Sequence, residues 1–238
     1  MRSLLAKSLL VLSVVAATAA HADPRHVRMW RGFKIADMSE KSFIDGLNQK
    51  LFPATGELFQ NGAGLEVYVP ATLNHGATQA GLPEEVALLS YQNEETYKAF
   101  RATPAGKHYG ELHWDLFVKD TSKSLVAEEY SGSLAVEHAY VSGALTPVRG
   151  GENVFMVQYK DITESEEQWL SHLNDSLARN ANGNGFAVLV AHDYALLYLF
   201  GRKAGGEPAG SLLQESMIKI DREVKGVGES IYYQPRAK

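Results

Sequence analysis

Short apolar segments alternate with amphipathic ones along the chain, and the spacing of their hydrophobic residues separates strands from helices. Alternating residues predict a strand at 27–35 that is partly buried on both faces, and apolar residues at helical spacing predict a helix over 43–51. Pro53 is expected to end or kink that helix, because its ring removes a backbone donor. A second strand is predicted at 65–69, and the uninterrupted apolar run at 86–91 predicts a central strand.

Two helices and a fourth strand complete the first half. Asn93 is predicted to cap one helix. Thr103 and Pro104 are predicted to start the next, since threonine favours the N-cap and proline the first helical position. A fourth strand of alternating character is predicted at 134–141. The predicted order of the first half is therefore β-α-β-β-α-β.

The same order recurs after a boundary that Thr146-Pro147 and Gly150-Gly151 predict. The members of this second copy are a strand at 154–159, a helix capped by Thr163 with Glu166 as its capping-box partner, a hairpin of strands at 186–191 and 195–200, a helix over 212–224 and a strand at 230–233. The chain is thus predicted to contain one supersecondary unit twice.

The β-α-β-β-α-β order is that of the ferredoxin-like unit, an antiparallel sheet with both helices on one face. Such a unit leaves the other face of its sheet uncovered, and an apolar sheet face must be buried against a partner. The predicted fold class is therefore α+β, with two tandem ferredoxin-like units, 23–147 and 148–238, packed sheet to sheet as an α/β-barrel.

The element order and the stretch 82–91, LPEEVALLSY, resemble the dimeric α/β-barrel superfamily, which includes antibiotic-biosynthesis monooxygenases. The resemblance covers nearly all of the chain after residue 22. It implies a cavity between sheet and helices. Because members of the superfamily include cofactor-free oxygenases and haem-binding enzymes, it also implies either a base in an apolar pocket or one axial histidine.

The first 22 residues have the pattern of a secretory signal peptide. Arg2 and Lys7 precede the apolar run 8–20, and the sequence AHA at 20–22 supplies the small residues of a cleavage site. We therefore expect the segment 1–22 to be removed and the protein to be periplasmic or secreted. The apolar run is too short for a membrane span, and no other stretch is long and apolar enough for one, so the remainder is expected to be soluble.

Composition narrows the classes of function. Removal of Arg2 and Lys7 would change the formal net charge from −5 to −7, and no lysine- or arginine-rich run is present, so nucleic-acid binding is not expected. The chain has no cysteine, which excludes disulfides, thiol nucleophiles and cysteine zinc sites. His108 and His113 are five residues apart, whereas a helical zinc motif needs four, so no metal site is predicted.

The densest group of titratable and aromatic residues lies at 103–115, and these are the ingredients of a ligand pocket. His113 is the candidate general base, with Asp115 placed to orient its imidazole. The catalytic candidates are His113, Asp115 and Tyr91, and the ligand-binding candidates are His108, Tyr109, Trp114 and Arg101. The structural alternative is a helix end whose aromatic rings close the mouth of the barrel, with His113 as a hydrogen-bonded spacer.

Three functions remain open. The first is a non-catalytic barrel, monomeric or homodimeric, that binds a small ligand or a partner protein without a cofactor. The alternative that the resemblance implies is a cofactor-independent monooxygenase-like enzyme acting on a small aromatic substrate. The third is haem binding, for which His172 on the predicted second-unit helix is the candidate ligand.

Overall fold

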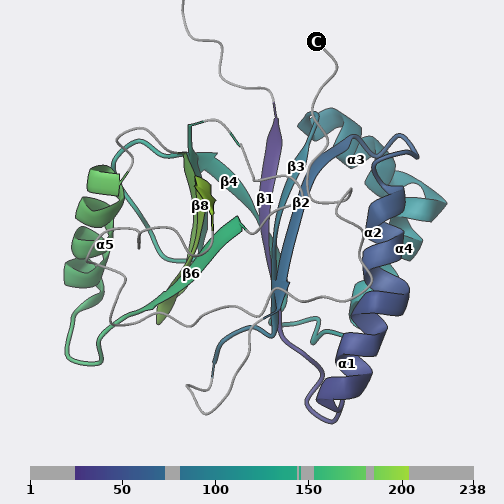
Figure 1. Cartoon of the computed structure of the whole chain (residues 1–238), viewed down its shortest axis with the longest axis horizontal. Coiled ribbons are helices and arrows are strands. Elements are labelled where there is room, and N and C mark those ends of the chain that lie inside the picture. Colours follow the sequence, from purple (N-terminus) through teal and green to yellow (C-terminus); the bar gives the residue numbers. More distant parts are fainter. Residues whose placement is uncertain (1–24, 73–80, 144, 146–152, 181–184, 204–238) are drawn as a thin grey trace, which may run out of the picture.

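The computed structural model describes residues 25–72, 81–143, 145, 153–180 and 185–203 (Figure 1). The expected leader 1–22, the predicted helix over 212–224 and the predicted strand at 230–233 lie outside the described residues. The predicted boundary between the two units, at 147, also lies outside them and stays a prediction.

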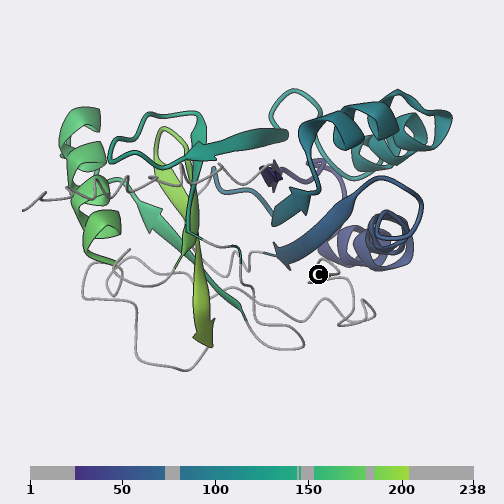
Figure 2. The ribbon, with the colours of Figure 1, turned by 90° about the horizontal axis from the view of Figure 1, so that it is seen from above.

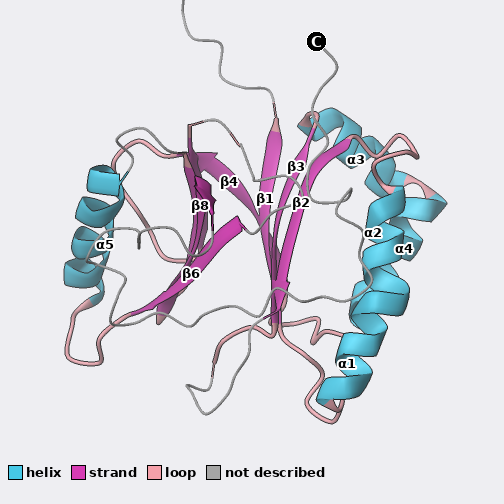
Figure 3. Ribbon diagram, viewed as in Figure 1, coloured by secondary structure: helices cyan, strands magenta, loops and turns pink. Residues whose placement is uncertain are grey.

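The first half forms a four-stranded antiparallel sheet with helices on one face (Figure 3). Its elements are β1 (His26–Gly32), α1 (Glu40–Gly46), the π-helical turn η1 (Leu47–Leu51), α2 (Phe52–Glu57), β2 (Leu65–Thr72), β3 (Glu85–Tyr91), α3 (Glu94–Ala102), α4 (Pro104–Trp114) and β4 (Lys123–Glu129). The strand order β2-β3-β1-β4 is the ferredoxin-like one. The predicted β-α-β-β-α-β order is confirmed, and β3 is central and buried along its whole length, as its sequence predicted.

The second half repeats the first three strands of this pattern. Its elements are β6 (Asn153–Tyr159), α5 (Glu166–Asn180), β7 (Phe186–Val190) and β8 (Tyr194–Lys203). The order β7-β8-β6 matches β2-β3-β1 of the first half, since each hairpin places its second strand beside the first strand of the unit. The additional strand β5 (His138–Ser142) pairs with β7 and with β4, so that the eight strands of the described residues form one sheet.

The fourth strand of the first unit was predicted in the wrong place. It is β4, at 123–129, whereas the predicted segment 134–141 overlaps β5, the strand that joins the two halves. The reason is that β4 is only partly buried and carries charged residues at both ends, so its sequence, KSLVAEE, lacks the apolar alternation of the other strands.

The two halves of the sheet curl so that their inner faces pack against each other (Figure 2). Met29 and Leu88 of the first half share a buried apolar cluster with Leu189 and Leu196 of the second. A hydrogen bond crosses this layer, because the Tyr198 hydroxyl donates to a backbone carbonyl on β2 over 2.8 Å. The predicted α+β class and the sheet-to-sheet packing are therefore confirmed.

Helices cover the two outer faces. Helices α1 to α4 lie over the first half-sheet and α5 over the second, each with its own apolar cluster (Figure 1). Trp30 points from β1 into the helix-side cluster whereas Met29 points into the sheet–sheet core, so β1 is buried on both faces, as predicted. Within the described ranges no helix has the length and apolar character that crossing a bilayer requires.

Local signals fix most helix ends. The Asn93 and Thr103 side chains accept hydrogen bonds from backbone amides three residues on, which confirms both predicted N-caps. Pro53 does not end the first helix. It follows a π-helical turn in which the Phe52 amide bonds to the Leu47 carbonyl, and the helix continues as α2.

The predicted cap of α5 is shifted by two residues. Ser165, rather than Thr163, forms a reciprocal capping box: the Gln168 amide donates to the Ser165 hydroxyl, and the Gln168 side-chain oxygen accepts from the Ser165 amide. Thr163 instead donates to the Asp161 carboxylate, in the turn before the helix.

Candidate functional site

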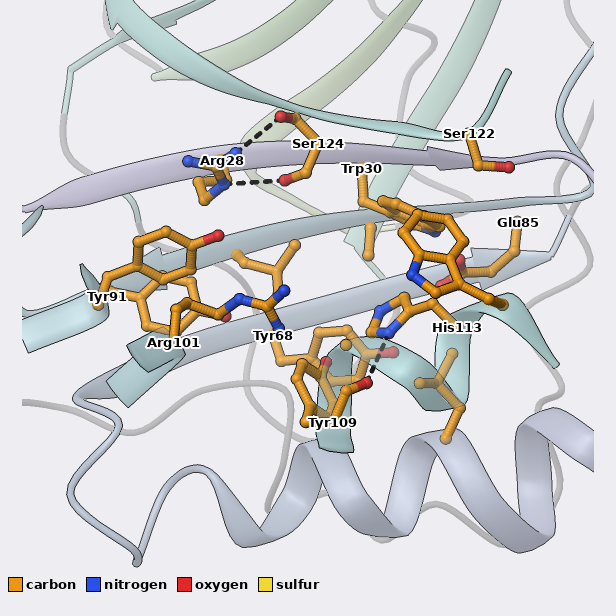
Figure 4. Close-up of a pocket in the computed structure, with 16 residues that line it drawn as sticks. Arg28, Trp30, Tyr68, Glu85, Tyr91, Arg101, Tyr109, His113, Ser122 and Ser124 are labelled. Atoms are coloured by element: carbon orange, nitrogen blue, oxygen red, sulfur yellow. Dashed lines mark hydrogen bonds between the residues drawn. The ribbon is translucent and has the colours of Figure 1, made fainter. Parts of the chain in front are cut away.

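A cavity of about 250 Å³ lies between the outer face of the first half-sheet and helices α3 and α4 (Figure 4). Its walls are formed by Arg28, Trp30, Leu51, Tyr68, Glu85, Ala87, Leu89, Tyr91, Tyr97, Arg101, Tyr109, Gly110, His113, Trp114, Ser122 and Ser124. Aromatic rings make up much of this wall, and a few ionisable groups converge between them. This combination is typical of a small-molecule site.

Successive side chains of a strand point to opposite faces of the sheet, and this alternation decides which residues of the sheet line the cavity. Alternate residues of β3, from Glu85 to Tyr91, face the cavity, while Val86 and Leu88 face the sheet–sheet core. Trp30 of β1 pairs with Ala87 of β3, and the small alanine leaves room beside the indole.

Two glycines of α4 bring that helix close to Arg101 on α3. The Arg101 guanidinium donates to the Gly106 carbonyl oxygen over 2.9 Å. At Gly110, a Cβ atom would lie 2.7 Å from Arg101 Nη2, so only glycine leaves the guanidinium this place against the helix. Figure 4 shows the guanidinium reaching into the middle of the cavity.

His113 stands one helical turn after Tyr109. Its Nδ1 is 2.9 Å from the Tyr109 carbonyl oxygen, and its ring makes edge contacts with Trp30 and Tyr109 at centroid distances of 5.0 and 4.9 Å. Burial lowers the pKa of His113 to about 4 and outweighs the hydrogen bond to the carbonyl, which favours the charged form. The imidazole is therefore neutral at pH 7, with Nδ1 protonated and the other nitrogen left as an acceptor.

Of the residues that the structure describes, Glu85 is the one carboxylic acid in the wall of this cavity, and it is buried. Burial raises the pKa of Glu85 to about 8, although the neighbouring Trp30 indole opposes this in part. Among the described residues, no group forms a hydrogen bond with Glu85 Oε2. The side chain is thus a neutral acid at pH 7, with an oxygen that is free to bond to a ligand or a water.

Tyrosines close the deep side of the cavity. The Tyr109 hydroxyl lies 2.9 Å from the hydroxyl of Thr55 on α2, which ties α4 to the first helical segment. Burial raises the pKa of Tyr68, Tyr91 and Tyr109, so all three phenols stay protonated at any ordinary pH.

Arg28 lies at the opposite end from Glu85. Its Nε and Nη2 donate to the side chain and carbonyl of Ser124 over 2.9 and 2.7 Å, and the guanidinium stands 4.8 Å from the centre of the Tyr97 ring. A third contact, of 3.0 Å, joins it to the imidazole of His26, whose pKa is lowered by burial and then by Arg28 itself. Arg28 is therefore held by the protein.

The structure brings five of the seven predicted site residues together. The cavity wall includes Tyr91, Arg101, Tyr109, His113 and Trp114. Asp115 does not face His113: its carboxylate is exposed and 4.0 Å from the ammonium of Lys50. His108 is also exposed and outside the cavity wall, 3.9 Å from Glu111, since it lies on the outer side of α4.

Apart from Tyr91, the sequence prediction missed the residues that the sheet contributes, above all Glu85, Trp30 and Arg28. A signal for Glu85 was present. Glu85 opens a strand in which Ala87, Leu89 and Tyr91 follow at a spacing of two. Glu85 therefore faces the same side of the sheet as Tyr91, which was predicted to be a site residue.

The residues around His172 do not fit a haem ligand. The side chain is 67% exposed on α5, and its Nδ1 is 2.5 Å from Glu164 Oε1. A haem-binding histidine needs a pocket that shields the porphyrin, and His172 has solvent on one side and an acidic partner on the other. In the parts of the chain that the structure describes, no three histidine or acidic side chains gather as a metal site.

No protein-family model matches the chain, and no curated protein matches its sequence. Solved structures do match, in 22 chains. A protein from Fusobacterium nucleatum, provisionally named a monooxygenase, is 8% identical over 84% of this chain and 94% of its own, with a TM-score of 0.42.

Other solved structures match over one unit. A dimeric protein of ferredoxin-like fold and unknown function from Bacteroides fragilis is 9% identical over 44% of this chain and 97% of its own, with a TM-score of 0.35. A hydroxynitrile lyase from Passiflora edulis is 10% identical over 46% of this chain and 98% of its own, with a TM-score of 0.36. At such identities the likeness is one of fold alone.

Proposed function

We propose that this protein binds a small aromatic molecule in the cavity between the first half-sheet and helices α3 and α4. The observation that carries the proposal is the wall itself, in which aromatic rings surround ionisable groups whose charge states burial has set. A cavity of about 250 Å³ suits a molecule of one or two rings. Export after removal of residues 1–22 remains part of the proposal.

The charge states favour binding over general-base catalysis. A base works best when its pKa lies near the working pH, whereas the pKa of His113 is about 4. The neutral imidazole is instead suited to accept a hydrogen bond from a ligand hydroxyl. Figure 4 shows its second nitrogen turned toward the cavity and away from the Tyr109 carbonyl.

A titration with 2-naphthol tests the proposal. At 100 times its dissociation constant a ligand adds about 2.7 kcal/mol to the free energy of unfolding, which a melting curve shows clearly. Ala87→Leu fills the cavity from its floor and should abolish the rise in melting temperature, and Leu89→Phe is a second filling variant if the first fails to fold. Val126→Leu, on the exposed face of β4, is the control and should respond like the native chain. Equal stabilisation of filled and unfilled variants would overturn the proposal.

The second candidate is the cofactor-independent oxygenase that the superfamily resemblance implies. What favours it is that a hydrogen-bond acceptor, His113, and a protonated acid, Glu85, face one cavity, and separated pKa values are typical of acid–base pairs. Oxygen uptake in the presence of a hydroquinone is the measurement. The enzyme function requires uptake by the native chain and its loss in both His113→Ala and Glu85→Gln.

A further inference from the structure

Arg101 has no anionic partner among the described residues. Its one hydrogen bond within that part of the chain goes to the Gly106 carbonyl, a neutral acceptor. Arg28, the other cation of the wall, differs from it, because Ser124, His26 and Tyr97 surround its guanidinium. Arg101 is therefore the cation of this cavity that remains available to a ligand.

The rest of the wall does not neutralise Arg101. Within the described part of the chain, Glu85 is the one carboxyl group in the wall, and it is a neutral acid at pH 7. His113 is neutral as well, and Tyr68, Tyr91 and Tyr109 are protonated. Arg101 is half-buried, so solvent screens its charge less than that of a fully exposed cation, and it attracts an anion more strongly than such a cation does.

We propose that the ligand of this cavity is an aromatic carboxylate, whose anionic group binds Arg101 while its ring packs among the aromatic side chains. The inference rests on the proposed binding function and names the chemical class of the ligand. A guanidinium matches a carboxylate in shape as well as in charge. The unpartnered Glu85 Oε2, buried at the other side of the cavity, provides a second polar contact for a substituent on the ring, such as a hydroxyl group.

The position of Arg101 is prepared before a ligand arrives. The Gly106 carbonyl holds one nitrogen of the guanidinium, and the bare backbone of Gly110 lets the other lie against α4. A side chain that is already held loses less conformational freedom on binding. The two glycines therefore belong to the anion site even though they contribute no side chain to it.

The test uses three probes that share one ring system: 2-naphthoate, 2-naphthamide and 2-naphthol, titrated into the full chain at pH 7 by calorimetry. The native protein should bind the carboxylate at least tenfold more tightly than the isosteric amide. Arg101→Gln should remove that preference and leave binding of the amide within about twofold. Gly110→Ala, which displaces the guanidinium without removing its charge, should reduce the preference as well.

Lys98→Gln serves as the control for general surface charge. Lys98 lies on the same helix as Arg101, but it is exposed and bound to Glu94 over 2.8 Å, so its loss should leave the preference unchanged. Equal affinities for naphthoate and naphthamide, or a preference that survives Arg101→Gln, would overturn the anion site and leave the binding function standing. Failure of all three probes to bind would overturn both.

Discussion

The imidazole of His113 and the backbone carbonyl of Tyr109, one turn earlier in α4, are joined at 2.9 Å by His113 Nδ1. Since a carbonyl oxygen only accepts, this contact fixes the proton of the neutral ring on Nδ1. Two properties of the site follow: the other nitrogen is an acceptor, and protonation of the ring would add a charge beside buried aromatic groups.

His113 should make the folded chain less stable in acid. Its pKa is about 4 in the folded chain and near 6.5 in the unfolded one, so the unfolded state takes up the proton first as the pH falls. The contribution of neutral His113 to the free energy of unfolding is full above pH 6.5. It is lost as the pH falls from 6.5 to 4, and the loss is no more than about 3 kcal/mol. Urea unfolding from pH 7.5 to 4.5 should show a smaller loss in His113→Gln than in the native chain. His108→Gln, at an exposed position of the same helix, should behave like the native chain, and identical curves for all three would refute the assignment.

Glu85 should act in the opposite direction. Its pKa is about 8 in the folded chain and near 4.5 in the unfolded one, so the folded state keeps a proton that the unfolded state releases. Stability is therefore full below pH 4.5 and is lost as the pH rises from 4.5 to 8. Glu85→Gln should remove this loss in unfolding experiments between pH 5 and 9, whereas Glu111→Gln, which is exposed on α4, should not. If the native chain and Glu85→Gln lose the same free energy of unfolding between pH 5 and pH 8.5, the raised pKa of Glu85 is contradicted.

The two glycines of α4 should respond differently to alanine. At Gly106 a Cβ atom would lie 2.1 Å from the backbone oxygen of Phe100, so α3 and α4 would have to separate. We expect Gly106→Ala to lower the free energy of unfolding by about 1–3 kcal/mol. At Gly110 the new atom meets only the movable end of Arg101, and alanine favours the helix by about 1 kcal/mol, so stability should change little. Urea unfolding measures the free energy of unfolding of both variants. An equal loss in Gly106→Ala and Gly110→Ala would be inconsistent with these contacts.

Periodicity predicted the strands and helices whose apolar residues face a core, because burial imposes the spacing that the sequence shows. β3 was predicted from a different signal, its uninterrupted apolar run, which reflects the burial of all seven of its residues. β4 was missed because it is only partly buried and Val126 is exposed, so the usual alternation of apolar residues is absent. Which segment joins the half-sheets depends on pairing between β4 and β5, and local sequence does not encode that contact.

The candidate site was half predictable for a similar reason. Residues such as Tyr109 and His113 are near each other in sequence because one helix carries them, so their local density pointed to the cavity. Glu85 and Trp30 reach the same cavity from two strands that are distant in sequence and meet only through sheet register. Asp115 shows the converse: it is two residues from His113, yet the helical turn directs it to solvent.

An ion pair links β1 to the connection between the halves. Arg31 is buried on the inner face of β1, and its guanidinium lies 2.6 Å from the carboxylate of Glu137, just before β5. Burial would raise the pKa of Glu137, but the charges of Arg31 and Lys123 outweigh it and lower the pKa. Because Glu137→Gln leaves a buried guanidinium without its counter-charge, it should cost about 2 kcal/mol of the free energy of unfolding.

An exposed pair supplies the matched comparison. Lys41 and Asp45 lie one turn apart on α1, with side chains 84% and 46% exposed. Asp45→Asn makes the same chemical change as Glu137→Gln and should cost less than about 0.5 kcal/mol, since water solvates whichever partner remains. Urea unfolding at low and high salt measures both, and only the Asp45 effect should shrink with salt. If the two substitutions cost the same, the Arg31–Glu137 pair does not stabilise the junction between the half-sheets.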